Sequence, residues 1–492
     1  MTENKATGGG IVSAHYCSRW NILKRKQVEA IHQASLQILE QTGIRLPHEH
    51  LQNELAARGA RVDKSSNVVY WPPALVEECL ASAPSSFKLC APDPARDLFL
   101  NGEQGYLTLD GSGVQVLDFE SGLVRPSTKQ DLEDAARVAD SLEQVAFMWP
   151  PISAQDYPRD LQPLHELDAL ISNTTKHIQA MTAVSPHSAR GSLEIAAAVA
   201  GGMDVLKERP IISNFQCSIS PLCYDAEGLE AAFIFARAGI PSGFMTMQVG
   251  SSTAPATLAG NLAIGNAEII AGMAALQVIC PGAPTFYGSC ATVMELKSGG
   301  VACGGPEDFM LQAMSAQMAR RYKVPSNVGT FATNAKASNW HAGVENAASG
   351  AASIFAGADM MCGAGLLNGA RIFSYEQLLL DCEIFEILRR TAAGFEVTAE
   401  TLALETIHRV GPGNHFMAEE HTFNHLREIW QPSVINRSAY DRWEAEGRRE
   451  ALQNAHDRAA EILKNHRPEI LNNQTRKLID AIIARYQEAG AY

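Results

Sequence analysis

The feature that most constrains this chain is a regular alternation of short apolar segments with longer helical ones in its middle. Seven apolar segments, each followed by ten or more residues of helical pattern, lie at 145–149, 177–182, 211–217, 244–249, 285–288, 326–331 and 359–363. Apolar strands separated by helices are typical of a parallel sheet that is covered on both faces. Seven units, with an eighth strand that the pattern does not locate, favour a (β/α)8 barrel of the TIM type over an open doubly wound sheet.

The regions on either side of these units have different patterns. An amphipathic helix is predicted over 24–41, and short strands and turns over 68–124, where the pair Asp110-Gly111 is a hairpin-type signal. Beyond Gly413 the chain becomes helical and charged. We therefore predict a helical and short-strand extension over 1–143, the barrel over 144–412 and a C-terminal helical cap over 413–492.

The composition narrows the class of protein. Hydrophobic residues make up 46% of the 492 residues and charged residues 19%, so a large core can form. A net charge of −14 argues against nucleic acid as the main partner. The ten cysteines form no CxxC pair, and neither a signal peptide nor a membrane span is evident. We therefore expect a cytoplasmic protein with reduced thiols.

In a barrel of this type the functional groups lie at the carboxyl ends of the strands. Aromatic residues are only 7% of the chain, yet they recur at these ends, as Trp149, Phe215, Phe286, Tyr287 and Phe331. A ring of aromatic faces with few formal charges suits a quaternary ammonium ion, whose diffuse charge is held by cation–π attraction. The alternative for each aromatic residue is that it simply plugs the barrel core.

Several motifs of the chain resemble the trimethylamine methyltransferase superfamily. They include PATLAG at 255–260, NAE at 266–268, PGAP at 281–284 and FSYEQ at 373–377, and such marks span roughly residues 30 to 445. The resemblance implies a (β/α)8 barrel that moves a methyl group from a methylated amine to the Co(I) form of a corrinoid on a separate small protein. The trimethylamine enzymes of this family carry pyrrolysine, whereas this chain has only standard residues; the corresponding position lies in or near 334–345.

Family members without pyrrolysine resemble enzymes that demethylate quaternary amines such as glycine betaine, proline betaine or carnitine. Such a substrate already carries its positive charge, so attack by Co(I) expels a neutral tertiary amine and no acid is needed. The enzyme then mainly aligns the reactants. We therefore expect a quaternary-amine:corrinoid protein methyltransferase without catalytic residues beyond positioning ones, with a corrinoid protein as partner and no tightly bound metal. The apolar helices suggest self-association.

A betaine also carries a carboxylate, which the chain must bind. His341 is the first candidate because it lies beyond a barrel strand and beside Trp340; Lys336 is a further one. Glu268 is either an orienting group or a core carboxylate whose hydrogen bonds are satisfied. The predicted substrate-binding residues are Phe215, Gln248, Tyr287, Phe331, Asn334, Trp340, His341, Glu345 and Arg371.

A competing pattern lies near the C-terminus, where Glu420 and His421 precede His425. Histidines at i and i+4 lie on one face of a helix, and at this spacing both imidazoles can bind the same zinc ion. The motif falls outside the barrel units, and we expect structural histidines or a docking surface for the corrinoid protein there. Two other functions stay open: a metal-dependent barrel hydrolase or lyase, which needs a His/Asp/Glu cluster at the strand ends, and a catalytically silent paralogue that binds a methylated amine.

Overall fold

The computed structural model describes residues 10–111, 113–468 and 471–490. Eight parallel strands close into a barrel, because the last strand pairs with the first. These strands are β7 (Gln104–Leu109), β10 (Val145–Met148), β11 (His177–Gln179), β12 (Ile212–Cys217), β13 (Ser242–Thr246), β15 (Tyr287–Ser289), β18 (Ser326–Gly329) and β19 (Met360–Ala364). The (β/α)8 barrel that the alternation predicted is therefore confirmed.

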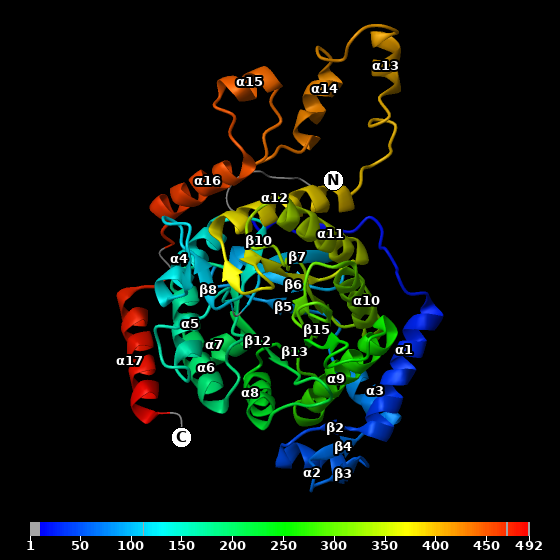
Figure 1. Ribbon diagram of the computed structural model, residues 1–492, viewed down its shortest axis with the longest axis vertical. Helices are drawn as coiled ribbons and strands as arrows, with labels where there is room; N and C mark the ends of the chain where they lie inside the picture. Colours follow the sequence, from blue (N-terminus) through cyan, green and yellow to red (C-terminus); the bar gives the residue numbers. More distant parts are fainter. Residues whose placement is uncertain (1–9, 112, 469–470, 491–492) are drawn as a thin grey trace.

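A major helix follows each strand and lies outside the barrel (Figure 1). The eight helices are α4 (Lys129–Ser141), α5 (Gln162–Ile171), α6 (Pro186–Ala200), α8 (Ala226–Arg237), α9 (Leu258–Ile279), α10 (Pro306–Tyr322), α11 (Trp340–Ala356) and α12 (Tyr375–Ala392). By length and composition α9 could cross a membrane, but 89% of its most apolar window is buried inside the fold. It is the central helix of a core.

The first barrel strand is the one that the sequence pattern did not locate. β7 lies within 1–143, the region predicted as an extension, so the barrel begins before residue 144. The pair Asp110-Gly111 follows this strand and does not turn a hairpin, since β7 pairs in parallel with β10 and β19. Parallel partners lie far apart in sequence, and local turn signals therefore do not reveal them.

The residues before β7 close the amino end of the barrel. β5 (Phe87–Leu89) and β6 (Leu98–Leu100) form a hairpin. In the segment that connects them, the backbone N–H of Cys90 donates to the Pro210 carbonyl and that of Asp93 donates to the Thr175 carbonyl. Pro210 and Thr175 stand just before β12 and β11. The carboxyl ends of the strands thus form the end of the barrel at which a site can be built.

The N-terminal helices form a second core with α9. The helices α1 (Arg25–Gln37), α2 (Glu49–Ala57) and α3 (Pro73–Ser82) all pack on it. The buried Asn266 of α9 donates to Ser35 and to Tyr322 at 2.9 and 2.8 Å, and accepts from Tyr287 at 3.1 Å. The buried amide group on this apolar helix therefore has its hydrogen bonds satisfied, and it joins α9 to α1, α10 and β15.

The two long helices of the C-terminal region pack on the outer helices of the barrel. The helix α16 (Ala451–Asn465) packs on α12 and α4, and α17 (Asn473–Ala489) packs on α6 and α5. Both brace the outer helices, so the predicted cap is a support for the barrel wall.

Between α12 and α16 the chain leaves the barrel as a projecting arm, residues 395–450 (Figure 1). The arm holds three short α-helices, α13 (Leu404–Val410), α14 (Glu420–His425) and α15 (Tyr440–Ala445), and one 3-10 helix, η3 (Leu426–Glu428). It exposes large apolar side chains, including Phe395, Met417 and Phe423. The arm therefore buries little apolar surface of its own.

Candidate active site at the carboxyl ends of the barrel strands

Three aromatic side chains meet inside the barrel. The ring centroid of Phe215, on β12, lies 4.9 Å from that of Trp149, which follows β10, and 6.4 Å from that of Phe286, which precedes Tyr287 of β15. All three are buried, and the indole Nε1 of Trp149 has no partner among the described residues. The sequence indicated these residues, and the structure brings them together as one aromatic cluster.

An acidic residue directly precedes a glycine that closely approaches this cluster. Asp110 follows β7, and a Cβ on the next residue, Gly111, would lie 2.3 Å from Met181 Sδ and 3.0 Å from Trp149 Cε3. In the described part of the chain, the Asp110 carboxylate has one hydrogen bond, from the Gly111 backbone N–H at 2.8 Å. Burial without a cationic partner raises the pKa of Asp110 to about 7.

Sequence reasoning missed Asp110, because the Asp-Gly pair was interpreted as a hairpin turn. A usable signal was present, because the mostly apolar segment 105–109 is followed directly by a single acidic residue. A barrel strand that carries a functional group at its carboxyl end has this pattern. A carboxyl group with a pKa near neutrality in a partly closed site is a candidate functional group.

Sulfur atoms line the wall beside Asp110. Cys290 Sγ lies 3.7 Å from Met245 Sδ, and it shares a hydrogen bond with Cys362 that raises its pKa well above the usual thiol range. Burial raises the pKa of Cys362, and the Asp110 carboxylate adds to this effect. These thiols are therefore neutral and apolar, and they are poor nucleophiles.

Three of the predicted site residues face the helices and not the barrel interior. Tyr287 donates to Asn266 of α9 and stacks on Tyr322 of α10. Gln248 donates to the Asn261 carbonyl of α9 at 3.1 Å. Phe331 packs where a Cβ on Gly350 of α11 would meet its ring at 3.0 Å. Neighbouring residues of a strand point to opposite faces, so Tyr287 lies outside while Phe286 lies inside.

Three other predicted residues form one network that joins the loop after β18 to α11. Glu345 accepts from the Asn334 backbone N–H at 2.9 Å, from His341 Nε2 at 2.8 Å and from the Thr333 hydroxyl. The Asn334 side chain donates to the Cys303 carbonyl at 3.0 Å. The Glu345 carboxylate therefore fixes this loop at the rim of the barrel.

The remaining predicted residues lie on the surface. Trp340, the first residue of α11, is 82% exposed. Arg371 and Lys336 are exposed as well, and Lys336 donates to the Asn334 carbonyl. The structure does not bring these three side chains into the aromatic cluster.

Glu268 is a core carboxylate. It is fully buried on α9 and accepts hydrogen bonds of 2.5–2.8 Å from the hydroxyls of Ser218, Ser220 and Thr246 and from the Leu222 backbone N–H. These donors lie on β13, at the end of β12 and on the loop that follows it. The carboxylate ties that loop to α9, which agrees with the structural alternative for this residue.

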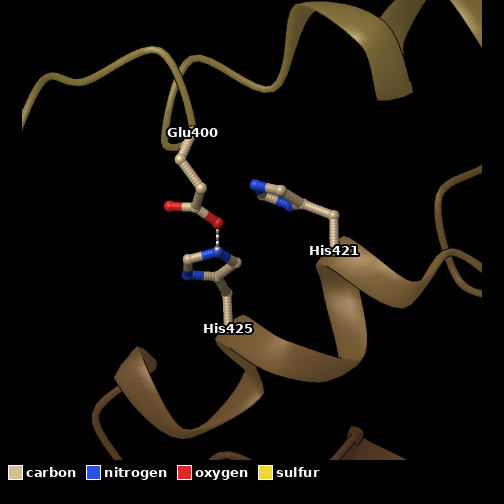
Figure 2. A group of neighbouring side chains, drawn as sticks. All are labelled: Glu400, His421 and His425. Carbon is tan, nitrogen blue, oxygen red and sulfur yellow. Dashed lines mark hydrogen bonds and ion pairs between the residues drawn. The ribbon is translucent and has the colours of Figure 1, made fainter.

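Within the described residues, the group whose donor atoms could hold a metal lies on the arm and not at the strand ends. It consists of Glu400, His421 and His425 (Figure 2). The two histidines are those singled out by their spacing, but the carboxylate is Glu400 and not Glu420. The strand ends thus lack the His/Asp/Glu cluster that a metal-dependent barrel enzyme needs, as far as the described ranges extend.

The fold and this arrangement define a barrel protein with an aromatic cluster and an acidic residue at its strand ends. Residues 6–491 match the profile of the trimethylamine methyltransferase (MTTB) family. The glycine betaine methyltransferase of Desulfitobacterium hafniense (strain Y51) is 34% identical over 476 residues, spanning 96% of this chain and 98% of that protein. The trimethylamine methyltransferase MttB of Desulfitobacterium hafniense (strain DSM 10664 / DCB-2) is 32% identical over 464 residues, 94% of this chain and 93% of that protein.

Among solved structures, the Methanosarcina barkeri monomethylamine methyltransferase (MtmB) superposes with a TM-score of 0.55 at 11% identity, covering 97% of this chain and 90% of that one. At this identity the likeness supports the fold alone. The protein is a barrel methyltransferase by its family and architecture. The chain belongs to the trimethylamine methyltransferase family.

Proposed function

We propose that this chain transfers a methyl group from a quaternary amine, glycine betaine or a related betaine, to the Co(I) corrinoid of a partner protein and releases the tertiary amine. The observation that carries the proposal is the aromatic cluster of Trp149, Phe215 and Phe286, which Gly111, the residue after Asp110, closely approaches. A quaternary ammonium ion has no N–H donor, so aromatic faces and the charge of a carboxylate are the groups that can bind it. A relative named for glycine betaine and the absence of pyrrolysine support the same substrate class.

The residues of this chain position the substrate and stabilise its charge. A Co(I) corrinoid on the partner supplies the electron pair that forms the new bond to the methyl carbon, while the C–N pair stays on the departing amine. Because that amine leaves neutral, no side chain has to donate a proton. The aromatic faces and Asp110 hold the ammonium group, and the flexible thioether of Met181 lies close to Gly111 beside them. Alignment of the reacting atoms then supplies the acceleration.

The substrate carboxylate needs a second binding group. We assign it to Asn334 and His341 at the rim, which Glu345 holds in place. Trp340, at the start of α11, and Arg371, on the segment that follows β19, are exposed and are available to the corrinoid protein. All ten cysteines are free, which suits the reducing cytoplasm that we expect for this enzyme.

The test is methylation of chemically reduced Co(I) cobalamin by the purified full-length protein, with glycine betaine, proline betaine, carnitine or trimethylamine added separately. We expect one quaternary amine to change the visible spectrum of the cobalamin and to release one tertiary amine per methyl group, while trimethylamine gives no reaction. Binding of a betaine, measured by calorimetry, without any methylation would favour the silent paralogue and contradict the proposal.

Two variants compare the role of the aromatic cluster in substrate binding with that of Tyr287, which faces the helices. Phe215→Leu keeps an apolar side chain but removes a ring face, and we expect KM for the betaine to rise about tenfold. Tyr287→Phe removes the hydrogen bond to Asn266, which lowers the free energy of unfolding by about 1 kcal/mol and leaves KM unchanged. Steady-state kinetics and urea denaturation measure both; equal KM values for the two variants would place the substrate elsewhere.

A further inference from the structure

The projecting arm gathers three metal-binding side chains from two separate segments. Glu400 lies on the loop before α13, while His421 and His425 lie one turn apart on α14. Their donor atoms are all within 4.8 Å of one another. Figure 2 shows both imidazole rings and the Glu400 carboxylate pointing toward a common centre.

We propose that the arm binds one divalent transition-metal ion of the zinc class through Glu400, His421 and His425. Two imidazoles and one carboxylate are a donor set that zinc accepts in tetrahedral sites. Mg²⁺ and Ca²⁺ prefer oxygen donors throughout, so this set discriminates against them. The site involves no residue at the carboxyl ends of the barrel strands, and it is independent of the proposed methyl transfer.

The surroundings of His425 match those of a metal-bound histidine. Its Nε2 lies 2.7 Å from a Glu400 oxygen, and its Nδ1 lies 2.5 Å from a Glu428 oxygen. A histidine ligand commonly directs its second ring nitrogen to a carboxylate, which fixes the tautomer and the orientation of the ring. Glu428 is therefore assigned as the residue that orients His425.

His421 distinguishes a metal site from a simple ion-pair cluster. A protonated His425 between Glu400 and Glu428 would by itself account for those two hydrogen bonds. It would not account for His421, whose Nε2 is buried and has no partner among the described residues. Its ring centroid lies 4.3 Å from that of His425. A shared ion satisfies this nitrogen, because it accepts a lone pair from each ring.

The ion would stabilise a segment that has little core of its own. The apolar side chains of the arm are largely exposed, so burial contributes little to holding the loop of Glu400 against α14. A metal that joins the two segments closes the intervening loop. His421 and His425 also line a cavity of ≈ 550 Å³ together with Thr422, Trp430 and Arg390. The Arg390 guanidinium donates to the Gly394 carbonyl.

The experiment uses untagged full-length protein, stripped of metal by a chelator and titrated with Zn²⁺ against a chromophoric competitor. We expect one Zn²⁺ per chain and no competition from Mg²⁺. His421→Ala and Glu400→Gln should each weaken the binding by roughly 100-fold or more, and Glu428→Gln by roughly 10- to 100-fold. The matched controls are His415→Ala and Glu420→Gln, exposed residues of the same arm, which should bind Zn²⁺ as the wild type does.

A second measurement reports on the arm itself. Zn²⁺ should slow proteolytic cleavage within 395–450 in the wild-type protein but not in Glu400→Gln, and substitution by Co²⁺ should give the visible absorption of a tetrahedral site. The proposal is overturned if Zn²⁺ binds only weakly and without a one-to-one stoichiometry, or if Glu400→Gln and Glu420→Gln bind it equally well.

Discussion

Replacement of Asp110 by asparagine is expected to lower kcat/KM for the betaine by roughly 100-fold and to abolish its pH dependence near neutrality. A cation beside a carboxylate in a partly buried site gains about 4 kcal/mol at an effective dielectric constant near 20, and loss of about 2.7 kcal/mol of this corresponds to the 100-fold effect. Burial raises the pKa of Asp110 to about 7, so the carboxyl group is neutral below this pH and charged above it. In the wild-type enzyme kcat/KM should therefore rise as the pH increases through about 7.

Asp381 provides the matched control for this variant. Burial raises the pKa of Asp381 to about 7 as well, but its carboxylate accepts from Asn346, Gln377 and the Gly365 backbone between α11 and α12. Asp381→Asn should keep the rise of kcat/KM with pH. If Asp110→Asn kept it too, Asp110 would not be the group that meets the cation.

The stability of the Asp110 variant separates a lost site from a misfolded protein. The folded-state pKa of Asp110 lies above the ordinary value of about 4, so its contribution to stability is complete below about pH 4 and declines as the pH rises to about 7. Asp110→Asn has no such decline. At pH 8 we expect it to be more stable than the wild type by about 2 kcal/mol, as measured by urea denaturation, while it is less active.

Glu268→Ala is expected to lower the free energy of unfolding by about 3–5 kcal/mol, the largest stability effect that we expect of a single substitution in this barrel. The change leaves three hydroxyl groups and the Leu222 backbone N–H without their common acceptor in a fully buried place. It also releases the loop after β12 from α9. Urea denaturation monitored by far-UV circular dichroism measures the change.

Glu268→Gln is the conservative partner of this variant. Its amide oxygen still accepts, and the hydroxyls of Ser218, Ser220 and Thr246 can turn to accept from the new NH2 group. We expect a loss of about 1–2 kcal/mol. A value for Glu268→Ala no larger than that for Glu268→Gln would show that the carboxylate does not hold the loop.

Part of this architecture could be predicted because its cause is local. The apolar segments and the helices between them follow from side-chain periodicity, and seven of the eight barrel strands lie where the pattern indicated. Phe215 could be selected from its position near the end of such a segment. The helix α10 begins at Pro306, where the missing N–H of proline costs nothing because the first helical N–H groups have no carbonyl partner within the helix.

Other features depended on pairings that a sequence pattern does not contain. β7 was missed because its partners β10 and β19 follow it at long and unequal distances along the chain, and Asp110 was missed with it. The direction of a side chain on a strand reverses with a shift of one residue, which is why Tyr287 was placed in the site that Phe286 occupies.

The sequence by itself determined the fold class, the aromatic character of the strand ends and the two histidines of α14, because each depends on residue types at short spacing. Only the tertiary structure decided which of these residues meet. It placed Gly111, the residue after Asp110, beside Trp149 and Glu400 beside His421, since each pair joins segments that are distant along the chain. Those contacts arise from closure of the barrel and from the path of the arm, and neither is encoded in local periodicity.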